Sequence, residues 1–344
     1  MMPRPDITGA STVRPDEARW WSYRPKRWRR PGRFGLIPGL PTRIGSVELR
    51  NPVMTASGTA GHGAELAVYL DLAGLGAVVT KSVSADSWPG NPAPRVHEAT
   101  AGMLNAVGLQ GPGVTAWLAD ELPPLLATGA TVVASIWGRS VDGYRRAADL
   151  LADAPAGVVA VEVNLSCPNV EDRSAMFAHS AEATEAAMAV TDGCGRPRWA
   201  KLSPNAGDLV PIVDAAMRGG AEAVTLVNTV MGMAIDPVTR AYRLGNGGGG
   251  LSGPAIHPVA VRAVHDVAAA RPHVPIVGVG GVTDAGTAAE LVVAGASAVQ
   301  VGTATFADPR APGRIAAELV DWCERHGVRD LRELIGAVHG HHGA

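Results

Sequence analysis

The sequence predicts an α/β protein, a (β/α)8 TIM barrel that follows an N-terminal extension. Two observations predict this fold. From Asn51 onward, short β-branched apolar runs alternate with longer segments rich in Ala and Leu, which suit helices. There are eight such runs, and continuous apolar strands are typical of a parallel sheet that is buried on both faces. A length of 344 residues suggests about two domains. However, α/β barrels that exceed roughly 250 residues are commonly a single domain.

The predicted strands share a short apolar core that ends in polar residues or glycine. They are residues 52–56, 77–81, 132–136, 158–164, 198–202, 223–228, 275–279 and 298–302. The helices predicted between them are residues 141–152, 181–190, 210–218, 258–270 and 285–294. No repeat of fixed period is found, which argues against a solenoid.

Residues 1–40 differ in composition from the remainder and are predicted to be an extension, with the barrel spanning residues 41–344. The extension has eight Arg and one Lys against three acidic residues, and it contains Trp20, Trp21 and Trp28. Such a segment cannot form a core alone. We expect it to lie over the barrel or to be partly disordered. A partner-docking arm and a membrane-surface anchor are the alternatives, and no clean amphipathic stripe supports the anchor.

Composition and charge exclude several classes of protein. Hydrophobic residues make up 47% of the chain and charged residues 18%, which excludes a disordered or collagen-like chain. The formal net charge is −2, so we expect no basic footprint for nucleic acid on the body of the protein. The three cysteines are widely spaced, and the chain lacks both a long uncharged run and the apolar centre of a signal peptide. We therefore expect a soluble, cytoplasmic protein without a transmembrane segment.

Polar residues follow the predicted strands at their carboxyl ends, where a barrel of this kind builds its active site. The chain has three lysines, and two of them, Lys81 and Lys201, fall at such strand ends. The other residues at these positions are Ala56, Ser57, Gly58, Ser82, Ser135, Asn164, Asn228 and Thr229. The sequence therefore predicts a polar site with two ammonium groups at one mouth of the barrel.

Three glycine clusters are predicted to form a phosphate site on the same rim. The last two predicted strands end in Gly280-Gly281 and Gly302-Thr303, and the loop 246–254 contains Ser252-Gly253. Glycine lets backbone N–H groups approach an anion, and the start of the next helix, capped by Thr283-Asp284, favours negative charge. The spacing departs from G-x-G-x-x-G, so a mononucleotide phosphate is favoured over a dinucleotide. A simple turn is the alternative for each cluster alone.

Cys167 is the candidate for chemistry at this rim. It lies just after a predicted strand, in a polar loop between Asn164 and Asn169. A thiolate there could act as a base or a nucleophile, whereas the alternative is a small buried apolar residue. No histidine falls at a predicted strand end, which favours removal of a carbon-bound proton over hydrolysis. We expect no metal site, because the chain has no C-x-x-C pair and its last histidines form a terminal tail.

Four asparagines fall at predicted strand ends or in the loop after the second strand, namely Asn105, Asn164, Asn169 and Asn228. Each is ordinary as a turn residue. As a set, they supply amide donors and acceptors that could bind a small planar imide or urea-like ring.

These residues stand in motifs that, in this order, resemble the class 1 dihydroorotate dehydrogenases, and most of all the class 1B catalytic subunit. The motifs are GNPAPR at 90–95, MLNAVGLQ at 103–110, NLSCPNV at 164–170, KLSPN at 201–205, NTVMG at 228–232, GGLSGPA at 249–255, GVGGV at 278–282 and GASAVQVGTATFADP at 295–309. The resemblance covers about residues 36–335. It implies an FMN-binding barrel that oxidises (S)-dihydroorotate to orotate in pyrimidine biosynthesis.

The resemblance also implies a role for each site residue. Cys167 would remove the C5 proton while hydride leaves C6 for the flavin. Lys201 would lie beside flavin N1 and O2, where its charge stabilises the anionic reduced flavin. The substrate would be held by Lys81, Asn105, Gly108, Leu109, Asn164, Asn169, Asn228 and Thr229. FMN would be held by Ala56, Ser57, Gly58, Lys81, Ser82, Ser135, Asn164, Lys201, Val227, Ser252, Gly253, Gly280, Gly281, Gly302 and Thr303.

Electrons must pass to an acceptor outside the chain, because three separated cysteines cannot ligate an iron-sulfur cluster. The class 1B resemblance implies a partner subunit with FAD and a 2Fe-2S cluster that passes electrons to NAD, whereas class 1A relatives use fumarate. We also expect a homodimer. Three features depart from the family, namely the segment 59–63 after Gly58, Trp137 and the basic, Trp-bearing extension before about residue 36. The segment after Gly58 and Trp137 leave open a related flavin oxidoreductase acting on another dihydropyrimidine or enone-type ring. A further alternative, in a different class, is a non-catalytic phosphate-binding barrel.

Overall fold

The computed structural model describes residues 39–166 and 177–341, and it confirms the predicted barrel. One sheet contains eight strands in the order β3-β14-β13-β10-β9-β8-β7-β4, and every ladder between these neighbours is parallel. The strands are β3 (Val53–Thr55), β4 (Val78–Val79), β7 (Val132–Ile136), β8 (Val158–Asn164), β9 (Arg198–Lys201), β10 (Ala223–Leu226), β13 (Ile276–Val279) and β14 (Ala298–Val301). The ring closes because Gly76 N–H donates to the Val53 carbonyl at 2.9 Å. Each strand lies within the range predicted for it.

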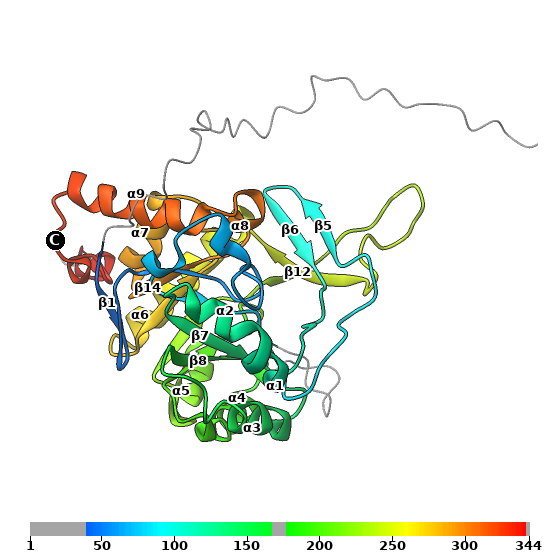
Figure 1. The fold of residues 1–344 in the computed structure, drawn as a ribbon. Coiled ribbons are helices and arrows are strands. Elements are labelled where there is room, and N and C mark those ends of the chain that lie inside the picture. Colours follow the sequence, from blue (N-terminus) through cyan, green and yellow to red (C-terminus); the bar gives the residue numbers. More distant parts are fainter. Residues whose placement is uncertain (1–38, 167–176, 342–344) are drawn as a thin grey trace, which may run out of the picture. The chain divides into compact units, whose positions relative to one another are not determined.

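Helices surround the barrel (Figure 1), and the five predicted helices are all present. They are α3 (Val141–Asp149), α4 (Ala181–Ala189), α5 (Val210–Arg218), α6 (His257–Ala270) and α7 (Ala285–Ala294). Side chains of Ser140 and Ser180 accept hydrogen bonds from the first turns of α3 and α4, and Asp284 forms a capping box with Thr287 at the start of α7. These caps explain why the sequence located the helix starts so closely.

Several helices were not predicted from the sequence. They are α1 (Val114–Ala116), the π-helical η4 (Trp117–Glu121), α2 (Leu122–Ala127), α8 (Ala304–Ala307) and α9 (Ala311–Arg325). The short 3-10 helices are η2 (Glu65–Val68), η3 (Leu72–Gly74), η5 (Phe177–His179), η6 (Asp192–Cys194), η7 (Pro254–Ile256), η8 (Leu331–Glu333) and η9 (Ala337–His341). None of the helices in the described ranges is long and apolar enough to cross a membrane.

A short hairpin covers the amino-terminal end of the barrel. It consists of β1 (Thr42–Ile44) and β2 (Val47–Leu49), which pair antiparallel. Ile44, Val47 and Leu49 are buried in one cluster with side chains from the barrel strands, Trp199 among them. The other mouth is thereby left for the candidate site. Most of the predicted extension, residues 1–38, lies outside the described residues, so the boundary at residue 40 stays a prediction.

A second sheet lies at the other end of the barrel from the hairpin (Figure 1). Its antiparallel strands are β11 (Val230–Met233), β12 (Gly248–Ser252), β6 (Gly102–Asn105) and β5 (Val96–Ala99), in that order. The prediction of a loop at 246–254 was therefore wrong for most of that segment. Glycine allows the pairing, because a Cβ on Gly249 would lie 2.4 Å from the carbonyl oxygen of Asn105.

Candidate active site

Three serine hydroxyls lie together at neighbouring strands of the barrel. Ser57 follows β3, Ser82 follows β4 and Ser135 lies near the end of β7. Their oxygen atoms form a triangle, with Ser57–Ser82 at 3.0 Å, Ser57–Ser135 at 3.2 Å and Ser82–Ser135 at 2.8 Å. The structure therefore brings these predicted site residues together at one mouth.

A chain of amide contacts continues from the serine triangle along the rim. Asn164, the last residue of β8, donates from Nδ2 to Ser82 Oγ at 3.2 Å. Asn228 Nδ2 donates to Asn164 Oδ1 at 3.2 Å, and Thr229 N–H donates to Asn228 Oδ1 at 2.9 Å. From the helix layer, Tyr144 OH donates to the Asn164 carbonyl at 2.7 Å. The linked groups are thus held in fixed orientations at the mouth.

A buried ion pair lies beneath these amides inside the barrel. Lys201 Nζ lies 3.4 Å from Glu162 Oε1, and their side chains are 5% and 0% exposed. Thr225 Oγ1 and Gln300 Nε2 donate to Glu162 Oε2 at 3.1 Å and 2.7 Å. Lys201 is paired with Asn164 across β8 and β9, so its cation adjoins the amide chain. Two charges taken out of water are tolerated here because they are paired and hydrogen-bonded.

Glu162 was missed in the sequence analysis, although a signal for it exists. It is the one acidic residue within the otherwise uncharged strand β8. An acidic side chain that faces the interior of a parallel barrel needs a partner. The lysine at the end of the following strand could have been paired with it from the sequence.

The three predicted glycine clusters converge on one place. Thr303 Oγ1 donates to Ser252 Oγ at 2.8 Å. A Cβ on Gly281 would lie 3.0 Å from the Gly253 carbonyl oxygen, and a Cβ on Gly253 would lie 3.4 Å from Thr303 Cγ2. Gly253 and Gly281 have φ values of +99° and +67°, which L side chains rarely adopt. We call Ser252, Gly253, Gly280, Gly281, Gly302 and Thr303 the glycine cradle.

The residues expected to hold a substrate lie on the second sheet and its loops. Asn105 Nδ2 donates to the Gly250 carbonyl at 3.3 Å, and a Cβ on Gly250 would lie 2.0 Å from Thr229 Oγ1. Asn105 is thus joined through β12 to Thr229 and the amide chain. Gly108 and Leu109 have φ values of +74° and +59°, and Gly108 packs against Asn91, where a Cβ would lie 2.6 Å from the Asn91 nitrogen.

Lys81 adjoins the atypical segment that follows Gly58. Its N–H donates to the Gly61 carbonyl at 2.9 Å. Burial, together with the nearby Lys81 charge, lowers the pKa of His62. Trp117 Nε1 donates to the His62 carbonyl at 2.7 Å. A neutral imidazole is therefore favoured beside the Lys81 ammonium group.

The remaining residues that were predicted to bind a cofactor lie at or near the ends of strands. Ala56 N–H donates to the Val301 carbonyl, and Val227 N–H donates to the Val279 carbonyl, each at 2.9 Å. Gly58 has a φ of +85°. These positions lie on strands or turns that reach the same mouth as the cradle and the serine triangle.

Cys167 and Asn169 lie outside the described residues, so the proposed base and one proposed substrate contact stay predictions. The other two cysteines are away from the mouth, Cys194 in η6 and Cys323 in α9. Both are buried, and burial raises the pKa of each thiol. Neither is suited to act as a thiolate.

Trp137, which directly follows β7, packs against the loop after β4. Its ring meets the Trp88 ring edge to face, with centroids 6.1 Å apart. The Arg139 guanidinium lies over the Trp88 ring, 4.5 Å from its centroid. Trp137 is only 3% exposed, and its indole is therefore part of the wall near the serine triangle rather than of the surface.

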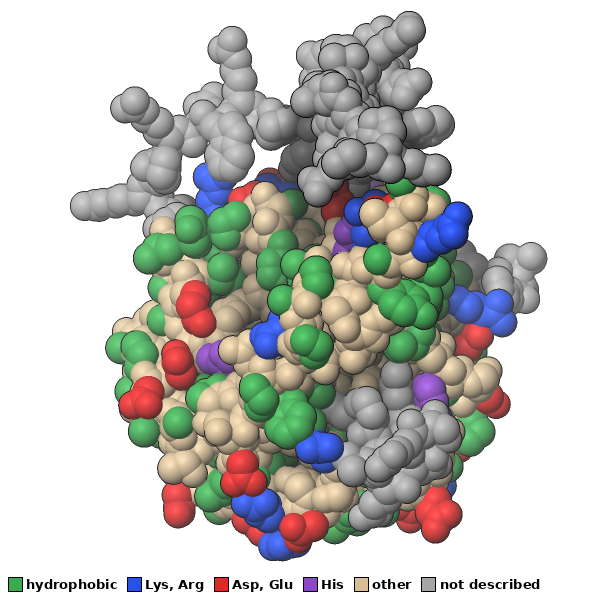
Figure 2. Space-filling view, turned by 90° about the vertical axis from the view of Figure 1, so that its right-hand side faces the viewer, with side chains coloured by type: hydrophobic (Ala, Val, Ile, Leu, Met, Phe, Trp, Pro, Cys, Tyr) green, Lys and Arg blue, Asp and Glu red, His purple; other side chains and the backbone are tan. Residues whose placement is uncertain are grey.

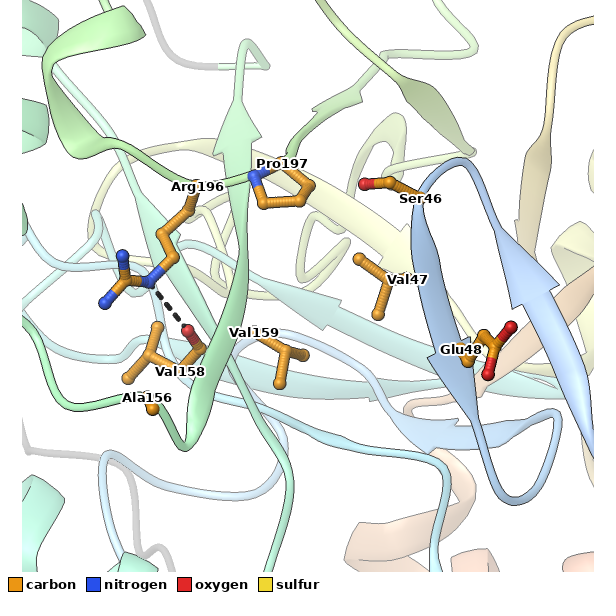
Figure 3. A pocket seen from close by; sticks show the side chains of 8 residues that line it. All are labelled: Ser46, Val47, Glu48, Ala156, Val158, Val159, Arg196 and Pro197. Atoms are coloured by element: carbon orange, nitrogen blue, oxygen red, sulfur yellow. Dashed lines mark hydrogen bonds between the residues drawn. The ribbon is translucent and has the colours of Figure 1, made fainter.

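A groove at the opposite end of the barrel has different chemistry (Figure 3). Figure 3 shows it between the hairpin and the start of β8, lined by Ser46, Val47, Glu48, Ala156, Val158, Val159, Arg196 and Pro197. The Arg196 guanidinium is hydrogen-bonded within the protein, because its Nε donates to the Val158 carbonyl at 3.0 Å. Within residues 39–166 and 177–341, no group of three His, Cys, Asp or Glu side chains is placed to hold a metal ion. The polar mouth remains the candidate active site.

The side of the molecule that carries the second sheet is shown in Figure 2. Charged side chains lie mostly toward its margins, and uncharged surface fills much of its middle. Such a surface suits a small ligand held by a few buried charges rather than a polyanion.

A closed parallel barrel with a cation, oriented amides and a glycine cradle at one mouth defines an enzyme of the phosphate-binding α/β barrel class. A family model described as dihydroorotate dehydrogenase matches residues 39–322. The chain belongs to the dihydroorotate dehydrogenase family and is an oxidoreductase. The resemblance inferred from the motifs is thus confirmed, and neither another ring substrate nor a non-catalytic barrel is favoured.

Curated relatives agree with the family model. The chain is 45% identical over 302 residues to "Dihydroorotate dehydrogenase B (NAD(+)), catalytic subunit" of Geotalea daltonii, with 88% of this chain and 98% of the relative covered. The protein of the same name from Desulforudis audaxviator is 48% identical over 297 residues, with 86% and 96% covered. A "Putative dihydroorotate dehydrogenase A (fumarate)" of Solibacter usitatus is 45% identical over 307 residues, with 88% and 99% covered.

Proposed function

We propose that this chain is the FMN-binding catalytic subunit of a class 1B dihydroorotate dehydrogenase, which oxidises (S)-dihydroorotate to orotate in pyrimidine biosynthesis. The observation that carries this proposal is the single barrel mouth at which the Lys201–Glu162 pair, the amide chain and the glycine cradle meet. A cation, amide groups and a phosphate site are the three elements that a flavin mononucleotide needs.

The residues present fit FMN. The Gly281 and Gly253 positions admit no Cβ, because neighbouring protein atoms fill that space, and glycine therefore lets the segments of the cradle pack together. Their backbone N–H groups would bind the phosphate. Among the described residues, the Gly281 N–H donates to no protein acceptor, which leaves it for an anion. Lys201, Ser57, Ser82, Ser135 and Asn164 would contact the ring. When bound, FMN would accept the hydride equivalent from the substrate.

The protein residues would orient the substrate and move its proton. Cys167 would take the proton from C5, and the charges of Lys81 and Lys201 would stabilise negative charge that develops near the ring. Asn105, Gly108, Leu109, Asn164, Asn169, Asn228 and Thr229 would hold the substrate. An amide can both donate and accept, so the Asn164–Asn228 pair can match the alternating N–H and C=O groups of the dihydropyrimidine ring.

Substrate identity is tested on the flavin itself. Under anaerobic conditions, dihydroorotate is expected to bleach the yellow absorbance of the purified full-length chain. Dihydrouracil lacks the carboxylate that Lys81 and the asparagines would bind, so it should bleach the flavin at least about 10²-fold more slowly. Stopped-flow absorbance measures both rates. Faster bleaching by dihydrouracil would overturn the proposed substrate, and a purified chain that binds no FMN would overturn the proposed cofactor.

We also propose that electrons leave through a separate subunit with FAD and a 2Fe-2S cluster to NAD, and that the chain is a cytoplasmic homodimer. The names of the first relatives, which call each a catalytic subunit, support a separate subunit. Light scattering on the purified chain measures its oligomeric state. A monomeric chain at micromolar concentration would contradict the homodimer.

The electron acceptor gives a second prediction. With dihydroorotate as the electron donor, the chain alone is expected to reduce an artificial dye. It is not expected to reduce NAD, because its three cysteines cannot hold an iron-sulfur cluster. NAD reduction is expected only after co-purification with the electron-transfer subunit. Steady-state assays with dye, NAD and fumarate test this. Rapid fumarate reduction by the chain alone would instead favour the class 1A acceptor.

A further inference from the structure

His257 lies directly behind the glycine cradle, at the start of α6. Its Nδ1 lies 2.7 Å from the Gly280 carbonyl oxygen, and its Nε2 lies 3.1 Å from Glu290 Oε2 on α7. A Cβ on Gly281 would lie 2.6 Å from the Cβ of His257, so the imidazole and the Gly280-Gly281 turn are in close contact. No residue of this set other than the glycines was singled out in the sequence.

The partners of the ring determine its protons. A carbonyl oxygen can only accept, so Nδ1 must carry a hydrogen and donate it to Gly280. An ionised carboxylate likewise only accepts, so the contact with Glu290 is a hydrogen bond only when Nε2 also carries a hydrogen. The Gly280 carbonyl on one side and the Glu290 carboxylate on the other thus fix the orientation of the ring.

The hydrogen bond to Gly280 also sets the direction of the next N–H. The peptide unit is planar and normally trans, so its C=O and N–H point in opposite directions. Because His257 holds the Gly280 carbonyl from behind, the N–H of Gly281 in the same peptide unit points away from the ring. Gly280 and Gly281 have φ values of +140° and +67°. The turn packs closely against Ala260 and His257, and the imidazole is the side chain that bonds to the Gly280 carbonyl.

We propose that His257 is a positioning residue for the FMN phosphate, which aims the Gly281 N–H at the phosphate, with Glu290 as the partner that orients the ring. This inference rests on the proposed function. It concerns the phosphate alone, because the isoalloxazine ring would lie at the serine triangle and Lys201.

Comparison of FMN with riboflavin, which lacks the phosphate, isolates this role. Dissociation constants of both flavins are measured on the full-length chain from the fluorescence of free flavin. His257→Ala is expected to raise the FMN constant roughly 10-fold, the value of one hydrogen bond to a charged group. The riboflavin constant should change less than about twofold, since riboflavin makes no phosphate contact. In the wild-type chain, the ring 15N shifts of His257 should show a proton on Nδ1, which faces the Gly280 carbonyl.

Two variants separate positioning from a structural role. His257→Asn places an amide nitrogen where Nδ1 stood, so it is expected to recover part of the FMN affinity. His265→Asn is the matched control on the same helix, because His265 bonds to its neighbour Asp266 through Nδ1 and packs against the His339 ring, with centroids 4.6 Å apart; it should bind FMN like the wild type. Equal losses for FMN and riboflavin, or no loss for either, would overturn the inference. A wild-type chain that binds neither flavin would overturn the proposed function instead.

Discussion

Replacing Cys167 by alanine is expected to slow flavin reduction by dihydroorotate roughly 10²- to 10⁴-fold, the usual contribution of a general base. The C5 proton of the substrate is weakly acidic, so its removal depends on a base held within hydrogen-bond reach. Flavin binding should be retained, because the cradle and the serine triangle are formed by other residues. Anaerobic stopped-flow absorbance measures the rate, and an orotate-induced shift of the flavin spectrum shows that the pocket is intact.

The buried Cys323 provides a matched control for this prediction. Cys323→Ala removes a buried thiol from α9, away from the mouth, and it should leave the rate of flavin reduction near the wild-type value. Cys167→Ser should recover part of the activity at high pH, since a hydroxyl is a weaker acid than a thiol and a poorer base at neutral pH. Wild-type rates in Cys167→Ala would show that another group removes the proton.

The strands and helices could be predicted because local signals determine them. A strand buried on both faces of a parallel barrel is apolar at every position, as Val158–Asn164 is apart from Glu162, and capping residues such as Ser140 and Asp284 mark helix starts. The hairpin 42–49 and the second sheet could not be predicted in this way. Their strands lack a continuous buried apolar run, since β1, β2, β5 and β11 alternate with exposed positions, and the second sheet forms through pairing of distant segments, as Gly250 does with Asn105.

The candidate site was predictable where position on a strand is sufficient. Ser57, Ser82 and Asn164 were identified because they end strands, and the structure brings them together. Glu162 and His257 were not identified, because their significance depends on partners from other elements. Lys201 lies 39 residues after Glu162 (201 − 162), and Gly280 lies 23 residues after His257. The contact of His257 with Gly280 becomes visible only in the structure, whereas an acidic residue in an apolar strand was a sequence signal for Glu162.

Replacing Lys201 by methionine is expected to cost the chain about 3–5 kcal/mol of unfolding free energy, the cost of leaving one member of a buried ion pair without its partner. Glu162 is 0% exposed, and the bonds from Thr225 and Gln300 remain but do not neutralise it. Urea denaturation of the full-length chain without added flavin, followed by circular dichroism, measures the loss. Arg218→Met is the matched control, because Arg218 and Glu185 form an exposed ion pair, and it should stay close to the wild type.

The double variant Lys201→Met with Glu162→Gln decides whether the loss is electrostatic. Removing both charges leaves no uncompensated carboxylate, and the glutamine can still accept the bonds from Thr225 and Gln300. We therefore expect the double variant to be at least about 2 kcal/mol more stable than Lys201→Met alone, a coupling typical of contacting charges. Additive losses would mean that Lys201 acts through packing of its aliphatic stem. Even a stable double variant should reduce its flavin poorly, because the cation beside the amide chain is absent. Slow flavin reduction in a stable variant would separate the role of Lys201 in chemistry from its role in folding.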